Sequence, residues 1–311
     1  MKRIILVLSY SLVSFTAAVC LFTAMILVAN SAYAYPGRDG SVNQTLSAAP
    51  NATVRVNNVA GSIKVLGWDK NQVQVTGTLS DDVTLDFHAT GNGVEIRAVY
   101  PEDSHNNAEA DLTIQVPVAS RLSVNTVSAD ILASGLNGRA QLESVSGDVT
   151  LDSHASDISA RSVSGEVSIT GSAPSAHVLG HSISGYVKIS GVDGDVQAES
   201  ISGMVKVFQS RLDRARLGST SGNVAFSAAL AKSGSYTFNS TSGNLSLAFP
   251  KAPDARFDIY TFSGDIDNNF GPKAQHTSEY GPGMELHFTN GAGSAQVTAH
   301  TLSGNITLGV P

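Results

Sequence analysis

Ser144-Val145-Ser146-Gly147-Asp148-Val149-Thr150-Leu151 is the stretch that decides the fold, because close copies of it return until the chain ends. Each copy has a hydroxyl residue, two further residues, a glycine, a variable residue and then an aliphatic residue. The copies begin at Ser162, Ser182, Ser200, Ser219, Ser240, Thr261 and Thr301, and an earlier one, with Ala in place of Gly, begins at Thr126. Most of them follow one another after about 18 to 21 residues. A period this short predicts a solenoid.

Alternation inside the phrase predicts a β-strand. If Val145, Val149 and Leu151 face inward, the two-residue period turns the polar residues between them outward and puts Gly147 inside. A glycine that faces inward makes room for a large side chain or a bend in the facing wall.

The residues before the phrase alternate as well, but in a different phase. Leu142 and Val145 are both apolar but lie three residues apart, so an unbroken two-residue period cannot place both on the inner side. The chain must therefore change direction next to Ser144. Ser and Thr side chains bond to nearby backbone and favour bends. We therefore predict that the recurring hydroxyl marks a corner.

Two strands, a corner and a looser turn make one coil, so the predicted fold is all-β, a parallel β-solenoid or β-helix with coils of about 18–21 residues. The repeat solenoid is expected over 122–311. Residues 51–121 contain strand patterns without the full serine-glycine phrase and are predicted to form an atypical N-terminal capping β region. The turn over 268–296 is the longest and leaves room for a degenerate coil or an inserted hairpin.

The start of the chain is predicted to be a signal peptide, 1–34. Lys2 and Arg3 precede a long apolar run that ends in Ala32-Tyr33-Ala34, which favours cleavage after Ala34. An uncleaved anchor is the alternative, since the run is long enough to span a bilayer. Residues 35–50 are polar with glycine and proline, and are predicted to be a linker. After cleavage we expect no stable membrane span and a periplasmic or secreted protein.

Charge and cysteine content exclude several function classes. The formal net charge of the chain is -7, and removal of the leader makes it more negative, so nucleic acid is not an expected partner. Cys20 is the only cysteine and lies inside the expected leader. The mature protein therefore has no disulfide and no thiolate metal site.

Several motifs occur in a fixed order before and within the repeats. They are Val59-Ala60-Gly61-Ser62-Ile63-Lys64-Val65, Gly67-Trp68-Asp69, Ile114-Gln115-Val116-Pro117, Val127-Ser128-Ala129-Asp130-Ile131 and the serine-glycine series. Over about 51–311 the chain resembles the bacterial putative-adhesin domain-of-unknown-function family. That resemblance implies an exported, extended β-solenoid assigned to adhesion or envelope interaction, and it brings no catalytic residues.

Outward columns of side chains are the places to look for chemistry, because equivalent residues stack about 4.8 Å apart. The residue after the glycine gives Asp130, Asp148 and Glu166 in adjacent coils. We interpret them as a solvated acidic face, because calcium needs six to eight oxygens and glycoside hydrolysis needs two carboxylates across a cleft. No catalytic residue, cofactor site or metal site is predicted.

The same columns bring Tyr186, Lys188, Met204 and Lys206 together as a mixed basic and apolar patch, which is the candidate binding face. The predicted function is that of an exported, non-enzymatic binding module in adhesion or envelope interaction. Its expected partner is an envelope or cell-surface protein or a glycan. A carbohydrate-active lyase or hydrolase on a parallel β-helix is the alternative, and the segment 268–296 is the one place with room for its cleft.

Overall fold

The computed structural model describes residues 40–101, 108–279 and 281–310, which all belong to one compact unit, 33–311. These residues form strands and turns. None of them forms a helix long and apolar enough to cross a membrane. The predicted signal peptide, 1–34, lies outside the described residues.

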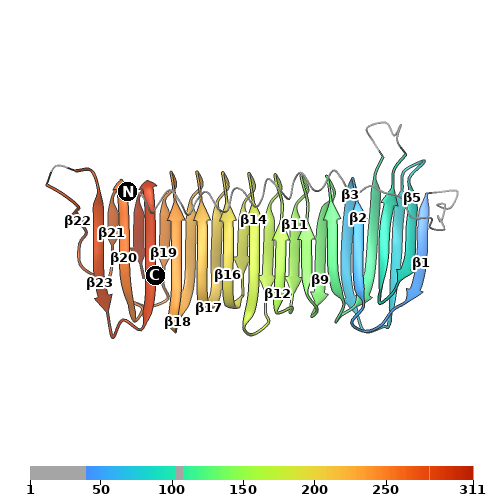
Figure 1. Ribbon diagram of the computed structural model, residues 1–311, viewed down its shortest axis with the longest axis horizontal. Coiled ribbons are helices and arrows are strands. Elements are labelled where there is room, and N and C mark those ends of the chain that lie inside the picture. The colour runs from blue at the N-terminus through green and yellow to red at the C-terminus, as the bar shows by residue number, and fades with distance from the viewer. Residues whose placement is uncertain (1–39, 102–107, 280, 311) are drawn as a thin grey trace. The chain divides into compact units, whose positions relative to one another are not determined.

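Nine strands form the first part of the unit and are blue to green in Figure 1. They are β1 Ser41–Ser47, β2 Thr53–Asn58, β3 Gly61–Trp68, β4 Gln72–Leu79, β5 Thr84–Thr90, β6 Gly93–Val99, β7 Ala110–Pro117, β8 Arg121–Thr126 and β9 Asp130–Leu136.

The serine-glycine repeats continue the strand series. The middle strands are β10 Ala140–Glu143, β11 Val149–Ser153, β12 Asp157–Arg161, β13 Val167–Gly171, β14 Ala176–Ser182, β15 Val187–Ser190, β16 Asp193–Ser200, β17 Val205–Ser219 and β18 Val224–Ser240. The last are β19 Leu245–Ala248, β20 Ala255–Ser263, β21 Ile266–Asn268, β22 Gln275–His276, β23 Met284–Asn290, β24 Ala295–Ser303 and β25 Ile306–Gly309.

Each repeat coil contributes one strand to each of two rows of parallel strands. In one row β8, β10, β12, β14 and β16 are successive neighbours, and the row continues into the second halves of β17 and β18. In the other, β9, β11, β13 and β15 lead into the first halves of β17 and β18. Equivalent residues are aligned, as Val149, Val167, Val187 and Val205 are. This arrangement confirms the predicted all-β solenoid.

The core lies between the two rows and changes character along the stack. Small and aliphatic side chains fill the middle coils, where Val167 and Ala160 are fully buried. Towards the C-terminal end the core is aromatic, and the ring of Phe226 meets those of Phe238 and Phe249 edge-on at 5.0 and 6.0 Å between centroids. Edge-to-face contacts of this kind stabilise beyond the area they bury.

The recurring hydroxyl lies at the corner of each coil and is buried. The Oγ of Ser162 accepts a hydrogen bond from the N–H of Gly165 at 2.9 Å and donates to the carbonyl of Gly147, one coil earlier, at 3.1 Å. The same two bonds recur at Ser182, Ser200 and Ser219. The predicted corner is thus confirmed, and its hydroxyl also joins neighbouring coils.

The inward orientation expected of Val145 is wrong. Val145 is half-buried, and its equivalents Val127 and Leu302 are 41% and 53% exposed. Inward positions are three residues apart here, at Ser144 and Gly147, because the corner takes up the extra residue. The apolar residue between them therefore lies on the outer ridge of the corner.

Gly147 is buried as predicted, but for a different reason. A Cβ at Gly147 would overlap the carbonyl oxygen of Ala129 in the preceding coil, and one at Gly165 would overlap that of Gly147. The glycine therefore allows the backbones of successive coils to approach closely. It does not make room for a large side chain.

The first and last coils of the chain do not lie at the ends of the stack. Strands β2 and β3 lie between the coil β8–β9 and the strands β6 and β7. Strands β24 and β25 lie between β18–β19 and the coil β20–β21. Figure 1 shows the blue strands β2 and β3 between green neighbours and the teal strands of the cap.

Antiparallel strands close the N-terminal end of the stack. Strand β4 pairs with β7, β1 with β4, and β5 with β6. Strand β1 falls within 35–50, so this segment contains an ordered strand where a linker was predicted. Val42 is 6% exposed and Leu46 packs against the core, while the polar residues that suggested a linker alternate with them.

The segment 268–296 closes the opposite end. Strand β23 pairs antiparallel with β20, and the short β22 pairs antiparallel with β23. The ring of Phe288 stacks on that of Phe257 at 4.5 Å, and Phe270 packs against both. Of the two arrangements left open for this segment, the structure shows the antiparallel hairpin.

Candidate binding face

The four residues of the candidate binding face lie together on two neighbouring coils. Strands β15 and β17 are parallel neighbours in which Val187 aligns with Val205 and Lys188 with Lys206. Tyr186 and Met204 precede these pairs and are 59% and 38% exposed. The spacing read from the sequence therefore brings all four side chains to one surface.

Phe208 also belongs to this surface, and the sequence reasoning missed it. The ammonium nitrogens of Lys188 and Lys206 lie 5.6 and 5.3 Å from the centroid of its ring. A cation over an aromatic face is attracted by about 0.5–1 kcal/mol at an exposed site. Phe208 follows Lys206 by two residues in the strand, and this outward position of an aromatic residue was the available signal.

The two lysines differ from most of the described arginines in having no acidic partner. Arginine side chains on the other row of strands pair with acidic residues one coil away, as Arg161 does with Glu143 at 3.4 Å and Arg211 with Asp193 at 2.8 Å. Among the described residues no ion pair involves Lys188 or Lys206. Their positive charge is therefore directed to solvent.

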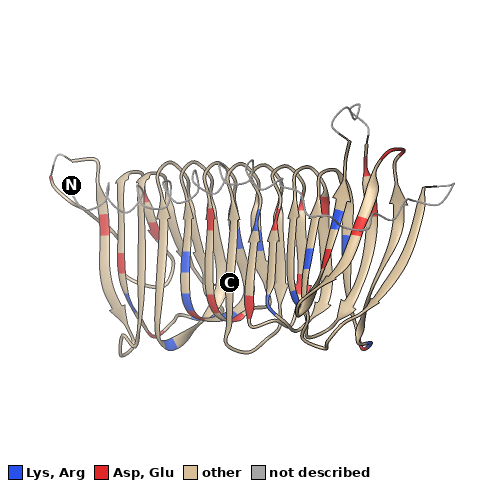
Figure 2. Ribbon diagram, turned by 45° about the vertical axis from the view of Figure 1, so that its right-hand side comes forward, with Lys and Arg blue, Asp and Glu red and all other residues tan. Residues whose placement is uncertain are grey.

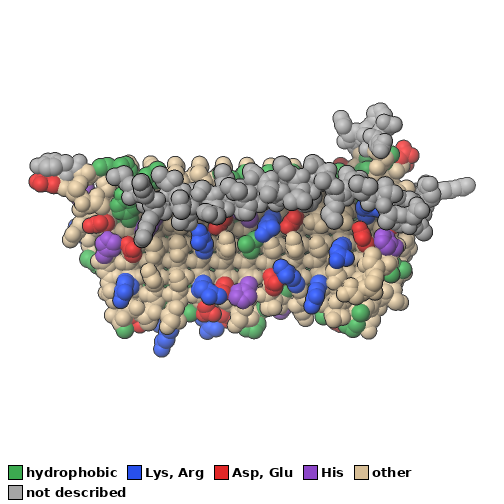
Figure 3. Space-filling view, viewed as in Figure 1, with side chains coloured by type: hydrophobic (Ala, Val, Ile, Leu, Met, Phe, Trp, Pro, Cys, Tyr) green, Lys and Arg blue, Asp and Glu red, His purple; other side chains and the backbone are tan. Residues whose placement is uncertain are grey.

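Charged residues of both signs are spread over the strands of the stack (Figure 2). On the face seen in Figure 3, basic, acidic and histidine side chains alternate in rows along the stack. Exposed pairs of this kind contribute little to stability, with a median near 0–1 kcal/mol. The paired charges neutralise one another, whereas Lys188 and Lys206 have no ion pair among the described residues and lie side by side on two neighbouring coils.

The acidic column has a structural role. The backbone N–H of Asp148 donates to the carboxylate of Asp130 at 2.8 Å, and that of Glu166 donates to Asp148 at 2.7 Å. Further along, the N–H of Asn244 donates in the same way to Asn223 at 2.9 Å. Side-chain oxygens at this position therefore join successive coils, and within the described residues no acidic or histidine cluster with the makings of a metal site is present.

Several described histidines take part in pairs or are half-buried, whereas His154 and His276 are exposed. The Nδ1 of His177 lies 3.1 Å from Asp195, and His287 lies 3.1 Å from Asp258. Burial lowers the pKa of His181 and of His300, which lie in β14 and β24. Both residues are half-buried in their strands.

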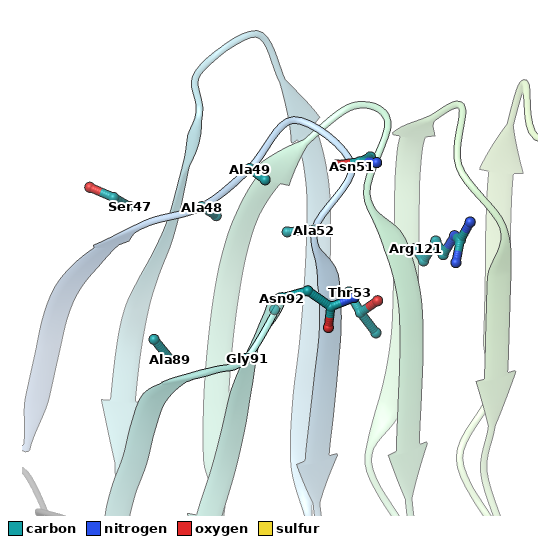
Figure 4. Close-up of a pocket in the computed structure, with 11 residues that line it drawn as sticks. Ser47, Ala48, Ala49, Asn51, Ala52, Thr53, Ala89, Gly91, Asn92 and Arg121 are labelled. Atoms are coloured by element: carbon teal, nitrogen blue, oxygen red, sulfur yellow. The ribbon is translucent and has the colours of Figure 1, made fainter.

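A pocket of about 310 Å³ lies near the N-terminal end of the stack (Figure 4). Its lining is mostly small and polar, with Ala48, Asn51 and Asn92 among its residues. Arg121 is the charged residue of the lining, and Figure 4 shows its side chain pointing away from the others. None of the residues of the candidate binding face lines this pocket.

Trp68 lies at the end of β3 beside the capping strands. Its indole N–H donates to the carbonyl of Gln72 at 2.8 Å, and the ammonium of Lys70 lies 4.7 Å from its ring centroid. The half-buried indole thus holds the turn between β3 and β4.

The chain belongs to the family described as Toastrack DUF4097, whose model matches residues 69–309. This confirms the resemblance read from the sequence motifs. A comparison with curated proteins gives no match.

Solved structures give distant matches over almost all of this chain. A putative adhesin from Bacteroides fragilis is 12% identical, with 88% of this chain and 98% of that one covered and a TM-score of 0.41. A putative lipid binding protein from Parabacteroides distasonis is 14% identical, with 89% and 99% covered and a TM-score of 0.38. A putative cell adhesion protein from Clostridium sporogenes is 10% identical, with 87% and 100% covered and a TM-score of 0.23.

Proposed function

We propose that this protein is an exported binding module of the cell envelope or cell surface that attaches to its partner without chemically changing it. The observation that carries the proposal is the surface formed by Tyr186, Lys188, Met204 and Lys206. It combines two cations that lack acidic partners with exposed apolar groups on a scaffold of stacked coils. Membership of the Toastrack family supports a binding role.

The leader and the family resemblance support export. The proposed order of events is removal of residues 1–34, folding outside the cytoplasm and attachment to an envelope or cell-surface protein or glycan. Mass spectrometry of the exported protein tests the first step and is expected to find Tyr35 at the N-terminus. An intact Met1 in a membrane fraction would contradict it.

The binding role is tested by probing arrays of glycans and of envelope proteins with the exported protein. The double variant Lys188→Glu/Lys206→Glu is expected to bind the partner more weakly, and the loss should be larger at low salt, because charges at such a surface act mainly through long-range attraction. Lys251→Glu/Lys273→Glu is the matched control, since it makes the same change of charge at exposed lysines outside this surface. Equal binding by the two variants would contradict the assignment of the surface.

The same preparations distinguish binding from catalysis. Incubation with bacterial and plant polysaccharides is expected to leave the length of the polymers unchanged. Depolymerisation that is lost on mutation of Glu285 in strand β23 would contradict the non-enzymatic proposal.

A further inference from the structure

In each coil, the residue that follows the glycine of the repeat, or Ala129 in the first copy, takes part in backbone hydrogen bonds between neighbouring coils. This series of bonds is continuous along the stack. From Asp130 to Asp265 the stack has eight steps between such residues, and at every step the carbonyl accepts a hydrogen bond from an aliphatic residue of the adjacent coil. The donors are Ile131, Val149, Val167, Val187, Val205, Val224, Leu245 and Ile306. The backbones are thus in register along the whole series.

In a second set of hydrogen bonds, the N–H group of the same residue donates to a side-chain oxygen of the adjacent coil. This set is present at some steps of the stack and absent at others. Where the residue of the previous coil is Asp or Asn, its side-chain oxygen accepts this N–H at 2.7 to 2.9 Å. This occurs at five steps, whose donors are Asp148, Glu166, Asn244, Asn305 and Asp265. At the three steps between Glu166 and Asn223 no such bond is present.

We call these three steps without a side-chain bond the gap. The gap has a simple chemical cause. Tyr186 and Met204 stand where the other coils carry Asp or Asn, and neither side chain places an oxygen against the next N–H. Glu166 is one methylene longer than Asp and accepts no bond from the next coil. As a result, the N–H groups of Tyr186, Met204 and Asn223 have no acceptor among the described residues.

The three N–H groups lie close to two lysines that form no ion pair within the described part of the chain. Lys188 and Lys206 follow Tyr186 and Met204 by two residues, so they lie on the same face of the same two coils. Neither has an ion pair with a described residue, and both ammonium groups lie near the exposed side of Phe208. Backbone N–H donors and ammonium groups together form a site that attracts oxyanions.

We propose that this gap binds an acidic polysaccharide, whose carboxylate or sulfate oxygens take the positions that Asp and Asn side chains occupy in the other coils. The inference rests on the proposed function, because it names the ligand class for the same face. Oxygens placed as in the intact steps accept the N–H groups of Met204 and Asn223. The lysines attract the remaining charge, and Tyr186 and Phe208 offer rings to the apolar faces of sugars.

The test supplies acceptors for two of the three N–H groups without changing the net charge. In Tyr186→Asn/Met204→Asn the two amide oxygens are expected to accept the N–H groups of Met204 and Asn223, as Asn223 and Asn244 do in their own coils. The matched control, Tyr186→Ala/Met204→Ala, removes the same side chains but leaves the N–H groups available. Both are made in the full chain and measured as exported protein.

Binding is measured by titration with alginate, dextran sulfate, poly-glutamate and neutral dextran. The Asn variant is expected to lose at least about tenfold in affinity for the acidic polymers, because their charged groups lose hydrogen bonds to two N–H groups; tenfold corresponds to about 1.4 kcal/mol. The Ala variant is expected to retain more of the affinity than the Asn variant. A melting temperature of the Asn variant at or above that of the wild type shows that the loss does not come from unfolding.

Each alternative outcome has a distinct meaning. Wild-type affinity in the Asn variant, or an equal loss in both variants, overturns the assignment to the N–H groups. Equal binding of neutral dextran overturns the acidic ligand class but leaves a binding module. Binding of poly-glutamate alone makes the partner an acidic protein and overturns the polysaccharide. Binding of alginate but not of dextran sulfate, or the reverse, supports the site and identifies the acidic group.

Discussion

Close stacking of the coils depends on the recurring glycine, which carries a hydrogen atom where other residues carry Cβ. A Cβ at Gly165 would overlap backbone of the preceding coil, which cannot move without breaking its own ladder. At Gly218, in β17, a Cβ would meet only ordinary contacts, of which the nearest is the carbonyl of Asn239 at 3.6 Å. Gly165 and Gly218 therefore differ in whether the structure has room for a Cβ at that position.

Gly165→Ala is expected to destabilise the protein by at least about 1–3 kcal/mol, because overpacking against backbone forces the coils apart. Gly218→Ala is the control and is expected to change the free energy of unfolding by less than about 1 kcal/mol. Urea denaturation of both variants measures the difference. Equal midpoints would show that the coils can separate at the corner at little cost.

The second prediction at this scale concerns the direction of neighbouring side chains. Val167 is fully buried, whereas Ser168 is half-exposed beside Lys188 in the adjacent strand. Val167→Asp is expected to cost several kcal/mol, because it buries an unpaired charge. Ser168→Asp is expected to be nearly neutral, since its carboxylate faces a lysine. Thermal unfolding of the two variants distinguishes them, and similar melting temperatures would contradict the observed register.

At the scale of the element, one buried phenol adds to the backbone hydrogen bonds between the long strands β17 and β18. The hydroxyl of Tyr236 donates to the carbonyl of Leu212 and accepts the N–H of Ala231 at 2.8 Å. Burial raises the pKa of Tyr236 to about 12. The folded state therefore keeps this proton after the unfolded chain, whose tyrosines titrate near about 10, has lost it.

The contribution of this phenol to stability is complete below about pH 10 and is lost as the pH rises from about 10 to about 12. Wild-type protein is expected to lose unfolding free energy over this range, and Tyr236→Phe should lose less. At neutral pH the variant is expected to be less stable by about 1–3 kcal/mol, because the N–H of Ala231 is left without its acceptor. Chemical denaturation at pH 8, 10 and 11.5 provides the comparison. Parallel pH profiles for the two proteins would contradict the role of Tyr236.

Local elements of the fold could be predicted from the sequence, because the two-residue period and the recurring hydroxyl act within one coil. The position of Val145 could not, since the number of residues that a corner consumes depends on the hydrogen bonds of Ser144 to its neighbours. The common surface of the four residues of the candidate binding face could be predicted from their spacing. Phe208 was missed, as was the role of Asp130 as an acceptor for the next coil, because each depends on contacts with a neighbouring residue or coil.

At the scale of the whole molecule, the order of the coils in the stack differs from their order in the chain. Similar phrases fit similar neighbours, so the local pattern does not specify which coil lies next to which. The position of β24 between β18 and β20 therefore could not be predicted from the repeats. It follows from strand β23, which occupies the edge of β20 and leaves the last coil the space on the other side.

This order predicts an unusual pattern of hydrogen exchange. Backbone amides of β24 are expected to be protected as strongly as those of β12 in the middle of the stack, because both strands have hydrogen-bonded neighbours on two sides. Amides of β22, which pairs only with β23, should exchange much faster. Mass spectrometry of exchanged peptides gives the comparison. Rapid exchange throughout β24 would contradict the position of the last coil.

The enclosed position of the last coil also determines how the protein responds to mechanical tension. A force applied beyond β25 acts first on a strand that is held from both sides, so the stack cannot be unzipped from its outermost layer by pulling there. The hydrogen bonds of β25 to β19 and to β21 must break together before β25 leaves. Its loss would leave an empty space between two strands that are still folded. A pull from the other direction acts on β1, which pairs with β4 alone among the described strands and can peel away bond by bond. Under tension, the described strands are therefore expected to separate more easily at β1 than at β25.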